Sequence, residues 1–528
     1  MGEQRRIKSL GRVLLALVAT SLIISACGGP GPGTNPAAKL PIIPTDVSAA
    51  LRPFYEQQVT FADCPDNGDV RCAWVKVPIS YANPSAGAMK LRVAYHPTTA
   101  TGKDRLGFLF TNPGGPGGSG LDIPYQADGY LSERLISQFD ILGWDPRGVG
   151  LSTPIKCLTN RQKDALVNLN ATPTTPAGVA AFAAAQAAFG QACKTLNPAT
   201  YNHVGTVEAA HDMDIIRAVV KQSSMYYLGF SYGTYLGAWY AEQFPKRIAR
   251  MVLDGAINPA LNNTQGSYEQ LLGFEHALYR FLAWCPQSGS CPNALTGSQP
   301  SRIAAMVNEQ NLLAVHPAKT GTPSRPLTES LFQTGVVYAL YDDSNGWPTL
   351  AAALDDLFTR HDGTALLTMA DQYLNRQTNG TYPDNSLDSF NAVTCYDKPA
   401  TPGIPGTKVL VSQWSKVAPI LGANFAWANM TCAYWPAHTA MAPAPIHATG
   451  SAPIVVVGTV YDPATPYNEA VALSQQLQNG HLLTWIGDGH TAYNRGSTCI
   501  QDAVDNYLLH GTVPKPGTVC PELPHLRR

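Results

Sequence analysis

The sequence has few charged residues and no excess of either sign. Only 14% of its 528 residues are charged, against about 25% in an average protein. The 36 Lys and Arg are balanced by 37 Asp and Glu, which gives a formal net charge of -1. The lack of a basic surplus excludes a typical nucleic-acid-binding protein, which needs positive charge against phosphates. Intrinsic disorder is excluded as well, because 45% of the residues are hydrophobic. We therefore expect a folded globular protein.

The apolar run near the N-terminus is too short to cross a membrane. It covers residues 13–24 and follows four basic residues between positions 5 and 12, whereas a membrane-spanning helix needs about 20 residues. The pattern predicts a signal peptide over residues 1–26. The sequence Ile24-Ser25-Ala26-Cys27 resembles the lipobox of bacterial lipoproteins. We expect Cys27 to be lipidated and to attach the exported protein to the outer face of the cell membrane; an ordinary cleaved signal peptide is the alternative.

The cysteines lack the spacing of a metal site. No C-x-x-C and no paired Cys/His spacing occurs, so neither a metal nor another cofactor is expected. Eleven cysteines are present, and ten remain once Cys27 is set aside for the lipid. In an oxidising compartment ten cysteines predict disulfides, although their number alone allows on the order of a thousand pairings. We expect neighbours in the sequence to pair, because long cysteine-free stretches separate the pairs Cys64–Cys72, Cys157–Cys193, Cys285–Cys291, Cys395–Cys432 and Cys499–Cys520.

The body of the chain divides into a two-part core and an insertion. Residues 27–50 are rich in Gly and Pro and predict a tether. Eight short apolar runs predict strands at residues 73–78, 91–96, 106–111, 139–144, 225–230, 250–253, 453–458 and 482–486. The first two can form a hairpin, and helices predicted at residues 207–221 and 235–243 separate later ones. This alternation predicts a mostly parallel, doubly wound α/β sheet built from residues 51–257 and 446–528. Residues 258–445 predict a mainly helical insertion.

A G-x-S-x-G sequence lies between a predicted strand and a predicted helix. It reads Gly229-Phe230-Ser231-Tyr232-Gly233. A strand-to-helix turn of this sharpness strains the serine and exposes its hydroxyl at the edge of the sheet. A buried serine in a glycine-rich turn is the alternative. The context favours Ser231 as a nucleophile.

A nucleophilic serine needs a histidine base and an orienting acid, which follow it in the order Asp, then His, in this type of fold. Asp462 lies just past the strand predicted at 453–458, and His490 lies in a Gly-flanked loop past the strand predicted at 482–486. Asp488 is the alternative acid, but it sits beside the histidine, where reaching its Nδ1 is awkward. We therefore expect a triad of Ser231, Asp462 and His490.

An oxyanion hole needs backbone N–H groups aimed at the developing negative charge. Tyr232, which follows the nucleophile, is expected to supply one. The glycine-rich residues 112–120 follow the strand predicted at 106–111 and are expected to supply the other, from Gly114. A phosphate-binding loop is the alternative, but no Lys-Ser or Lys-Thr follows.

Together these motifs resemble the α/β-hydrolase peptidases related to proline iminopeptidase, and more closely the secreted tripeptidyl aminopeptidases of actinobacteria, which include mycobacterial lipoproteins. The resemblance covers about residues 60–520 and rests on residues 112–120, 143–148, 228–234, 253–255, 395–397, 432–436, 462–466 and 489–490. It implies an α/β-hydrolase fold in which the helical insertion is a lid. It also implies the same triad and the Gly114 oxyanion donor, and we expect Thr465 to steady the loop of the acid.

The resemblance implies a serine exopeptidase that releases short peptides, often tripeptides, from substrates with free N-termini. Such an enzyme needs an acidic group for the substrate ammonium; the candidates Glu269, Glu275, Asp342 and Asp343 in the insertion stay unranked. Two other functions stay open. An esterase, lipase or acyltransferase uses the same triad, and a lipoprotein that only binds would have no need of it.

Overall fold

The computed structural model describes residues 40–398, 403–439 and 441–523, which belong to one compact unit, Leu40–Arg528. The predicted signal peptide, Cys27 and residues 28–39 lie outside the described residues. The remainder of the predicted tether, residues 40–50, packs on the core. Arg217 Nη1 donates to the carbonyl of Ile42 at 2.9 Å, and the Ile42 and Ile43 side chains contact the main hydrophobic cluster.

One ten-stranded sheet organises the core, in the order β1-β2-β3-β5-β4-β6-β7-β8-β9-β10. The β1–β2, β2–β3 and β3–β5 pairs are antiparallel and the others are parallel. The strands are β1 (Ala62–Cys64), β2 (Asn67–Pro78), β3 (Ala88–His96), β4 (Gly107–Asn112), β5 (Phe139–Trp144), β6 (Met225–Phe230), β7 (Ile248–Asp254), β8 (Ile454–Tyr461), β9 (Gly480–Asp488) and β10 (Val519–Cys520). All eight predicted strands and the hairpin are confirmed, and so is the mostly parallel sheet. The very short β1 and β10 were not predicted.

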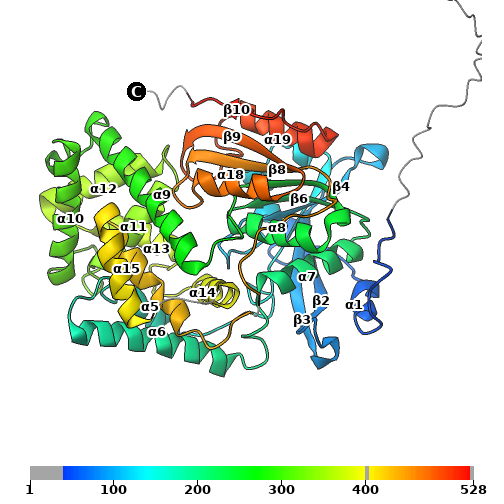
Figure 1. The fold of residues 1–528 in the computed structure, drawn as a ribbon, viewed down its shortest axis with the longest axis horizontal. Helices are drawn as coiled ribbons and strands as arrows, with labels where there is room; N and C mark the ends of the chain where they lie inside the picture. Colours follow the sequence, from blue (N-terminus) through cyan, green and yellow to red (C-terminus); the bar gives the residue numbers. More distant parts are fainter. Residues whose placement is uncertain (1–39, 399–402, 440, 524–528) are drawn as a thin grey trace, which may run out of the picture. The chain divides into compact units, whose positions relative to one another are not determined.

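Helices cover both faces of the sheet (Figure 1). On one face lie α1 (Arg52–Glu56), α7 (Thr206–Val219), α8 (Tyr232–Gln243) and α18 (Tyr467–Gln476); on the other lie α2 (Asp122–Tyr125), α3 (Ala127–Tyr130), α4 (Glu133–Ile136) and α19 (Thr498–His510). Neighbouring strand residues therefore enter separate cores. Tyr227 joins the first and Leu228 the second, and both are fully buried. Burial on both faces explains why the central strands are continuous apolar runs.

The chain between β7 and β8 is helical. It contains α9 (Asn263–Trp284), α10 (Gln299–Val315), α11 (Glu329–Leu340), α12 (Gly346–Arg360), α13 (Thr364–Tyr373), α14 (Ser386–Asp397), α15 (Ile404–Val417), α16 (Gly422–Ala428) and α17 (Met430–Ala433). Apolar residues of these helices form a core of their own, in which Phe274, Leu331 and Leu350 are almost completely buried. These helices gather to one side of the sheet (Figure 1).

Two helices that precede β6 in the sequence also pack on this helical part. They are α5 (Asn160–Val167) and α6 (Pro176–Leu196). Arg376 Nε donates to Asp164 Oδ1 at 2.6 Å, and the ring of Phe182 packs on Trp427 with centroids 5.9 Å apart. The helical layer beside the sheet thus includes residues from outside the segment 258–445.

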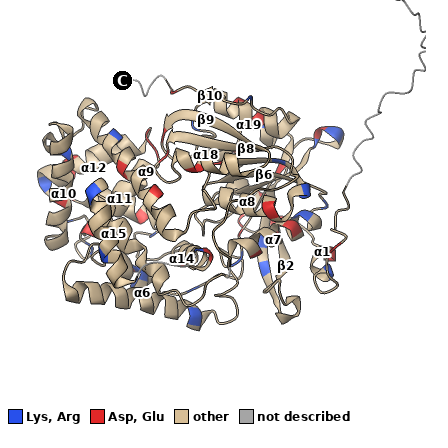
Figure 2. Cartoon of the chain, in the orientation of Figure 1, with Lys and Arg blue, Asp and Glu red and all other residues tan. Residues whose placement is uncertain are grey.

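The ten cysteines of the described residues form five disulfides, and each of the five predicted pairs is confirmed. Cys64–Cys72 joins β1 to β2, Cys499–Cys520 joins α19 to β10, and the other three close loops or join helices. Charged residues are sparse, and Lys and Arg are spread over the core and the helical layer without gathering on one element (Figure 2). No helix among the described residues is long and apolar enough to span a bilayer.

Candidate active site

The predicted nucleophile occupies a strained turn. β6 ends at Phe230 and α8 begins at Tyr232, so Ser231 alone joins the strand to the helix. Its φ is 53° and its ψ is -124°, a left-handed backbone conformation that costs a non-glycine residue about 1–3 kcal/mol. Its N–H donates to the carbonyl of Asp254 on the adjacent β7 at 2.9 Å. Tertiary contacts therefore maintain the strain.

The glycines of the motif are required by close backbone contacts. A Cβ on Gly229 would lie 2.6 Å from the carbonyl oxygen of Gly233, and a Cβ on Gly233 would lie 2.6 Å from that of Asn112. Neither distance is compatible with a side chain. The turn can thus place Ser231 next to the end of β4 only because both flanking residues are glycine.

The predicted acid and base lie together at the ends of β8 and β9. His490 Nδ1 is 2.9 Å from Asp462 Oδ1 and 3.1 Å from Oδ2. The Asp462 side chain is fully buried, and that of His490 is 12% exposed. Burial alone would raise the pKa of Asp462, but the imidazole and hydrogen bonds from backbone amides hold it below its usual value. An ionised Asp462 keeps the proton on Nδ1, which leaves Nε2 as the basic nitrogen.

The loop of the acid is closed by Thr465. Its N–H donates to Asp462 Oδ1 at 2.9 Å, its hydroxyl donates to Oδ2 at 3.0 Å, and the same hydroxyl is 3.3 Å from His490 Nδ1. The N–H of Thr491, the residue after the histidine, donates to Asp462 Oδ2 at 3.0 Å. Both loops are therefore fixed by one carboxylate.

The alternative acid, Asp488, has another partner. Its two oxygens accept from Arg280 Nε and Nη2 at 2.5 and 2.6 Å, and the Arg280 guanidinium lies over the ring of Tyr461. This bidentate pair joins α9 of the insertion to the end of β9. The structure gives Asp488 no hydrogen bond to His490.

Asp254, at the end of β7, links the nucleophile to the histidine loop. Its carbonyl accepts the N–H of Ser231, while its buried carboxylate accepts the N–H groups of Ala492 at 3.0 Å and Tyr493 at 2.8 Å. Burial raises the pKa of this carboxyl to about 6, although the two amides lower it. A Cβ on the next residue, Gly255, would lie 3.4 Å from His490 Cε1. This role was not predicted from the sequence; the one signal is Asp254-Gly255 directly after the strand predicted at residues 250–253.

The glycine-rich loop after β4 packs on the turn of the nucleophile. A Cβ on Gly114 would lie 2.9 Å from Ser231 Cβ and 3.0 Å from the Tyr232 nitrogen. The N–H of Gly114, however, donates to Asn112 Oδ1 at 3.0 Å. Within the described residues the N–H groups of Gly115 and Tyr232 have no acceptor. The loop thus lies where the sequence predicts it, but the Gly114 amide is already occupied.

The insertion reaches the histidine through Tyr341, which follows α11. The carbonyl of Tyr341 accepts the His490 N–H at 2.9 Å, and its ring packs edge-on against the imidazole with centroids 5.2 Å apart. A cavity of about 370 Å³ opens here, lined by His490, Tyr338, Tyr341, Met369 and Arg495 among others. This contact between distant segments had no sequence signal. Among the described residues no group of His, Cys, Asp or Glu is arranged to hold a metal.

The four acidic candidates of the insertion have partners of their own. Glu275 accepts the N–H groups of Ile420 and Leu421 in the helical core. Asp342 and Asp343 both pair with Arg495, and Glu269 accepts from Asn468 Nδ2 at 2.7 Å. Asp342 alone of the four lines the cavity beside His490.

This sheet, its helical layers and the paired acid and base at the strand ends define an α/β-hydrolase. Residues 418–520 match the family model described as TAP-like protein. Serine protease Hip1 of Mycobacterium tuberculosis is 35% identical over 468 residues, which cover 86% of this chain and 88% of the relative. Carboxylesterase B of the same species is 36% identical over 521 residues, covering 97% of both chains. The tripeptidyl aminopeptidase of Streptomyces lividans is 29% identical over 456 residues, covering 85% and 83%.

The chain therefore belongs to the family of α/β-hydrolase serine peptidases that includes Hip1. It is a serine hydrolase, and the resemblance inferred from its motifs is confirmed.

Proposed function

We propose that the protein is an extracytoplasmic serine exopeptidase that releases short peptides, chiefly tripeptides, from substrates with free N-termini. The observation that carries this proposal is the link between the Asp462–His490 pair and the strained turn of the nucleophile. Asp254 makes this link, because it accepts the N–H of Ser231 and also the N–H of Ala492 in the histidine loop. Membership of a peptidase family and the 29% identical tripeptidyl aminopeptidase support the substrate class.

In the proposed reaction His490 Nε2 takes the proton of Ser231 Oγ as that oxygen attacks the scissile carbonyl carbon. Asp462 stabilises the resulting imidazolium through Nδ1–H. His490 then returns the proton to the leaving amine, and the acyl group stays on Ser231 as an ester. A water molecule, deprotonated by the same Nε2, releases the short peptide and restores the hydroxyl. Thr465 keeps the carboxylate oriented throughout.

The oxyanion hole in this proposal uses the N–H of Tyr232 and a second N–H from the glycine-rich loop. We assign the second donor to Gly115 in place of Gly114, because Asn112 already accepts the N–H of Gly114. Gly115 and Tyr232 border one pocket, and their two N–H groups are available to stabilise the negative charge of the tetrahedral intermediate.

The proposed location is the outer face of the cell membrane, through a lipid on Cys27. The five disulfides support export, because disulfides persist in oxidising compartments. Membrane fractionation of the wild type and of Cys27→Ser tests the anchor. The wild type is expected in the membrane fraction and the variant in the soluble extracytoplasmic fraction; equal distribution of the two would contradict a lipid on Cys27.

An esterase is the second candidate, favoured by the 36% identical relative named Carboxylesterase B. A single experiment separates the two. The purified protein is given anilides of one to four residues, each with a free and an acetylated amine, and the matched p-nitrophenyl esters. A maximum at the free-amine tripeptide anilide supports the exopeptidase. Turnover restricted to esters, at any length and with either amine, favours the esterase.

A further inference from the structure

A small pocket adjoins the glycine-rich loop and is separate from the cavity beside His490. It has a volume of about 130 Å³ and is bordered by Gly115, Pro116 and Tyr232. In acyl transfer the oxyanion hole holds the carbonyl of the acyl part, and the histidine protonates the leaving group. The pocket next to Gly115 and Tyr232 therefore faces the acyl part of a substrate, and the cavity at His490 faces the leaving group.

Three ionisable side chains line this pocket: Asp397, Lys398 and Glu469. Glu469, on α18, is 5% exposed. One of its oxygens accepts the N–H of Asn258 at 2.8 Å, and the other has no hydrogen-bond partner among the described residues. The ammonium of Lys398 likewise makes no hydrogen bond or ion pair within the described residues and lies over the ring of Tyr235 at 5.0 Å.

The charges in the pocket do not balance. Two carboxylates face one ammonium, and burial raises the pKa of Asp397 and of Glu469 to about 7 while it lowers that of Lys398. Asp397 already accepts the N–H and the hydroxyl of Thr206. The group with a vacant acceptor is thus Glu469, and a second cation entering the pocket would restore neutrality.

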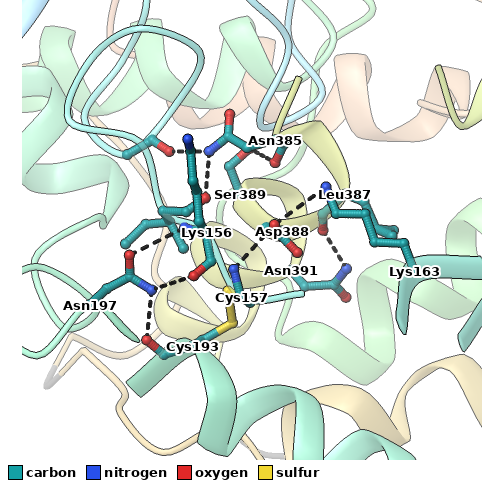
Figure 3. Close-up of a disulfide and its surroundings, with 12 residues drawn as sticks. Lys156, Cys157, Lys163, Cys193, Asn197, Asn385, Leu387, Asp388, Ser389 and Asn391 are labelled. Carbon is teal, nitrogen blue, oxygen red and sulfur yellow. Dashed lines mark hydrogen bonds and ion pairs between the residues drawn. A yellow bond between two sulfur atoms is a disulfide. The ribbon is translucent and has the colours of Figure 1, made fainter. Parts of the chain in front are cut away.

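The wall that carries Asp397 is helix α14, which is anchored at both ends. At the start of α14, Asn385 Nδ2 donates to the carbonyls of Gly148 and Ile155 at 2.7 Å each. One turn on, Asp388 Oδ2 accepts the N–H of Cys157 at 3.2 Å and lies 3.4 Å from Lys163 Nζ, beside the Cys157–Cys193 disulfide (Figure 3).

The other end of α14 is tied by the Cys395–Cys432 disulfide. The oxyanion loop packs directly on this helix, since a Cβ on Gly117 would lie 2.6 Å from Ser389 Oγ. The pocket, the helix and the loop therefore form one preorganised unit. Preorganisation of this kind lowers the cost of binding a charged group.

We propose that this pocket binds the N-terminal ammonium of the substrate, with the Glu469 carboxylate as its direct acceptor and Asp397 supplying further negative charge. The proposal rests on the proposed acyl transfer at Ser231 and names the group that selects a free N-terminus. Glu269, Glu275, Asp342 and Asp343, the four acids suggested by the sequence, all lie outside this pocket.

The test compares matched substrates that differ only in acetylation of the amine, each prepared as an anilide and as a p-nitrophenyl ester. Glu469→Gln removes the charge and keeps the size. We expect kcat/KM for the free-amine substrates to fall about 10- to 100-fold, with that for the acetylated substrates unchanged. Glu269→Gln, at an acid outside the pocket, is the matched control and should behave like the wild type.

Lys398→Met should change kcat/KM for free-amine substrates in the opposite direction. Removing the competing cation should lower KM for free-amine substrates and leave acetylated ones unaffected. Labelling of Ser231 by a fluorophosphonate shows that each variant is folded. An equal effect of Glu469→Gln on free and acetylated substrates, or weaker free-amine binding by Lys398→Met, would overturn the proposal. Cleavage of esters alone would refute the peptidase function, and the ester pair would still report whether the amine is recognised.

Discussion

Replacing Asp462 by Asn should remove nearly all catalysis while leaving the fold in place. In the structure the carboxylate accepts backbone N–H groups from Ala464, Thr465 and Thr491 and binds His490 Nδ1 at 2.9 Å. An amide oxygen can replace Oδ1, but the NH₂ group then occupies the Oδ2 position. There it faces the N–H of Thr491 and donates to Nδ1.

A histidine that accepts at Nδ1 carries its proton on Nε2, which is the wrong tautomer for taking a proton from Ser231. Loss of the correct tautomer costs about 10,000-fold in kcat in serine proteases, or about 5 kcal/mol of transition-state stabilisation. We therefore expect kcat of Asp462→Asn to fall by that order while KM changes little. Steady-state kinetics on a free-amine tripeptide anilide measures both.

Asp488→Asn is the matched control, because this acid lies two residues from His490 but pairs with Arg280. Among the described residues Asp488 hydrogen-bonds to Arg280 and not to His490, so its replacement should change folding stability rather than catalysis, and the control should keep kcat within about fivefold of the wild type. A tenth or more of the activity retained by Asp462→Asn, or an equal loss in Asp488→Asn, would contradict this role of Asp462.

Two further predictions concern the buried polar side chains of Thr465 and Glu329. Thr465→Val removes the hydroxyl that donates to Asp462 Oδ2, so kcat should fall about tenfold at constant KM. Thr465→Ser keeps the hydroxyl and should keep the wild-type kcat. An equal fall of kcat in both variants would show that the side chain acts through packing alone. Glu329, 2% exposed, accepts from Ala171 and Thr172, and burial raises its pKa from 4.5 to about 7. The folded state therefore favours the protonated carboxyl. The stability that this preference contributes is complete below pH 4.5 and is lost as the pH rises through 7. At about 1.4 kcal/mol per pKa unit, the raised pKa corresponds to a loss of about 3 kcal/mol. Glu329→Gln should therefore be more stable than the wild type in urea unfolding at pH 8 and should lose that advantage at pH 4.5; a difference independent of pH would refute this.

The parts of the site that follow local rules were predictable from the sequence. The turn at Ser231 is fixed by glycines two residues on either side, and Asp462 and His490 directly follow strands whose apolar runs are unmistakable. The disulfide pairs were predictable because each joins neighbours in the sequence, with separations between 6 and 37 residues.

Groups that act through long-range contacts were not predictable. Asp254 meets Ala492 across 238 residues, and Tyr341, which follows α11 in the insertion, meets His490 in the loop after β9. Glu469 and Asp397 share a pocket although they come from the core and from the insertion. The Gly114 amide was assigned to the oxyanion hole because a sequence cannot show that the Asn112 side chain folds back to accept it.

The acyl-enzyme on Ser231 is the most direct test of the central claim. The protein is mixed with a free-amine tripeptide p-nitrophenyl ester, quenched in acid within one turnover, digested and analysed by mass spectrometry. The account predicts a tripeptidyl adduct on the peptide that contains Ser231, a burst of one p-nitrophenol per active site, and neither with Ser231→Ala. Turnover by Ser231→Ala at the wild-type rate, or an adduct on another residue, would contradict it.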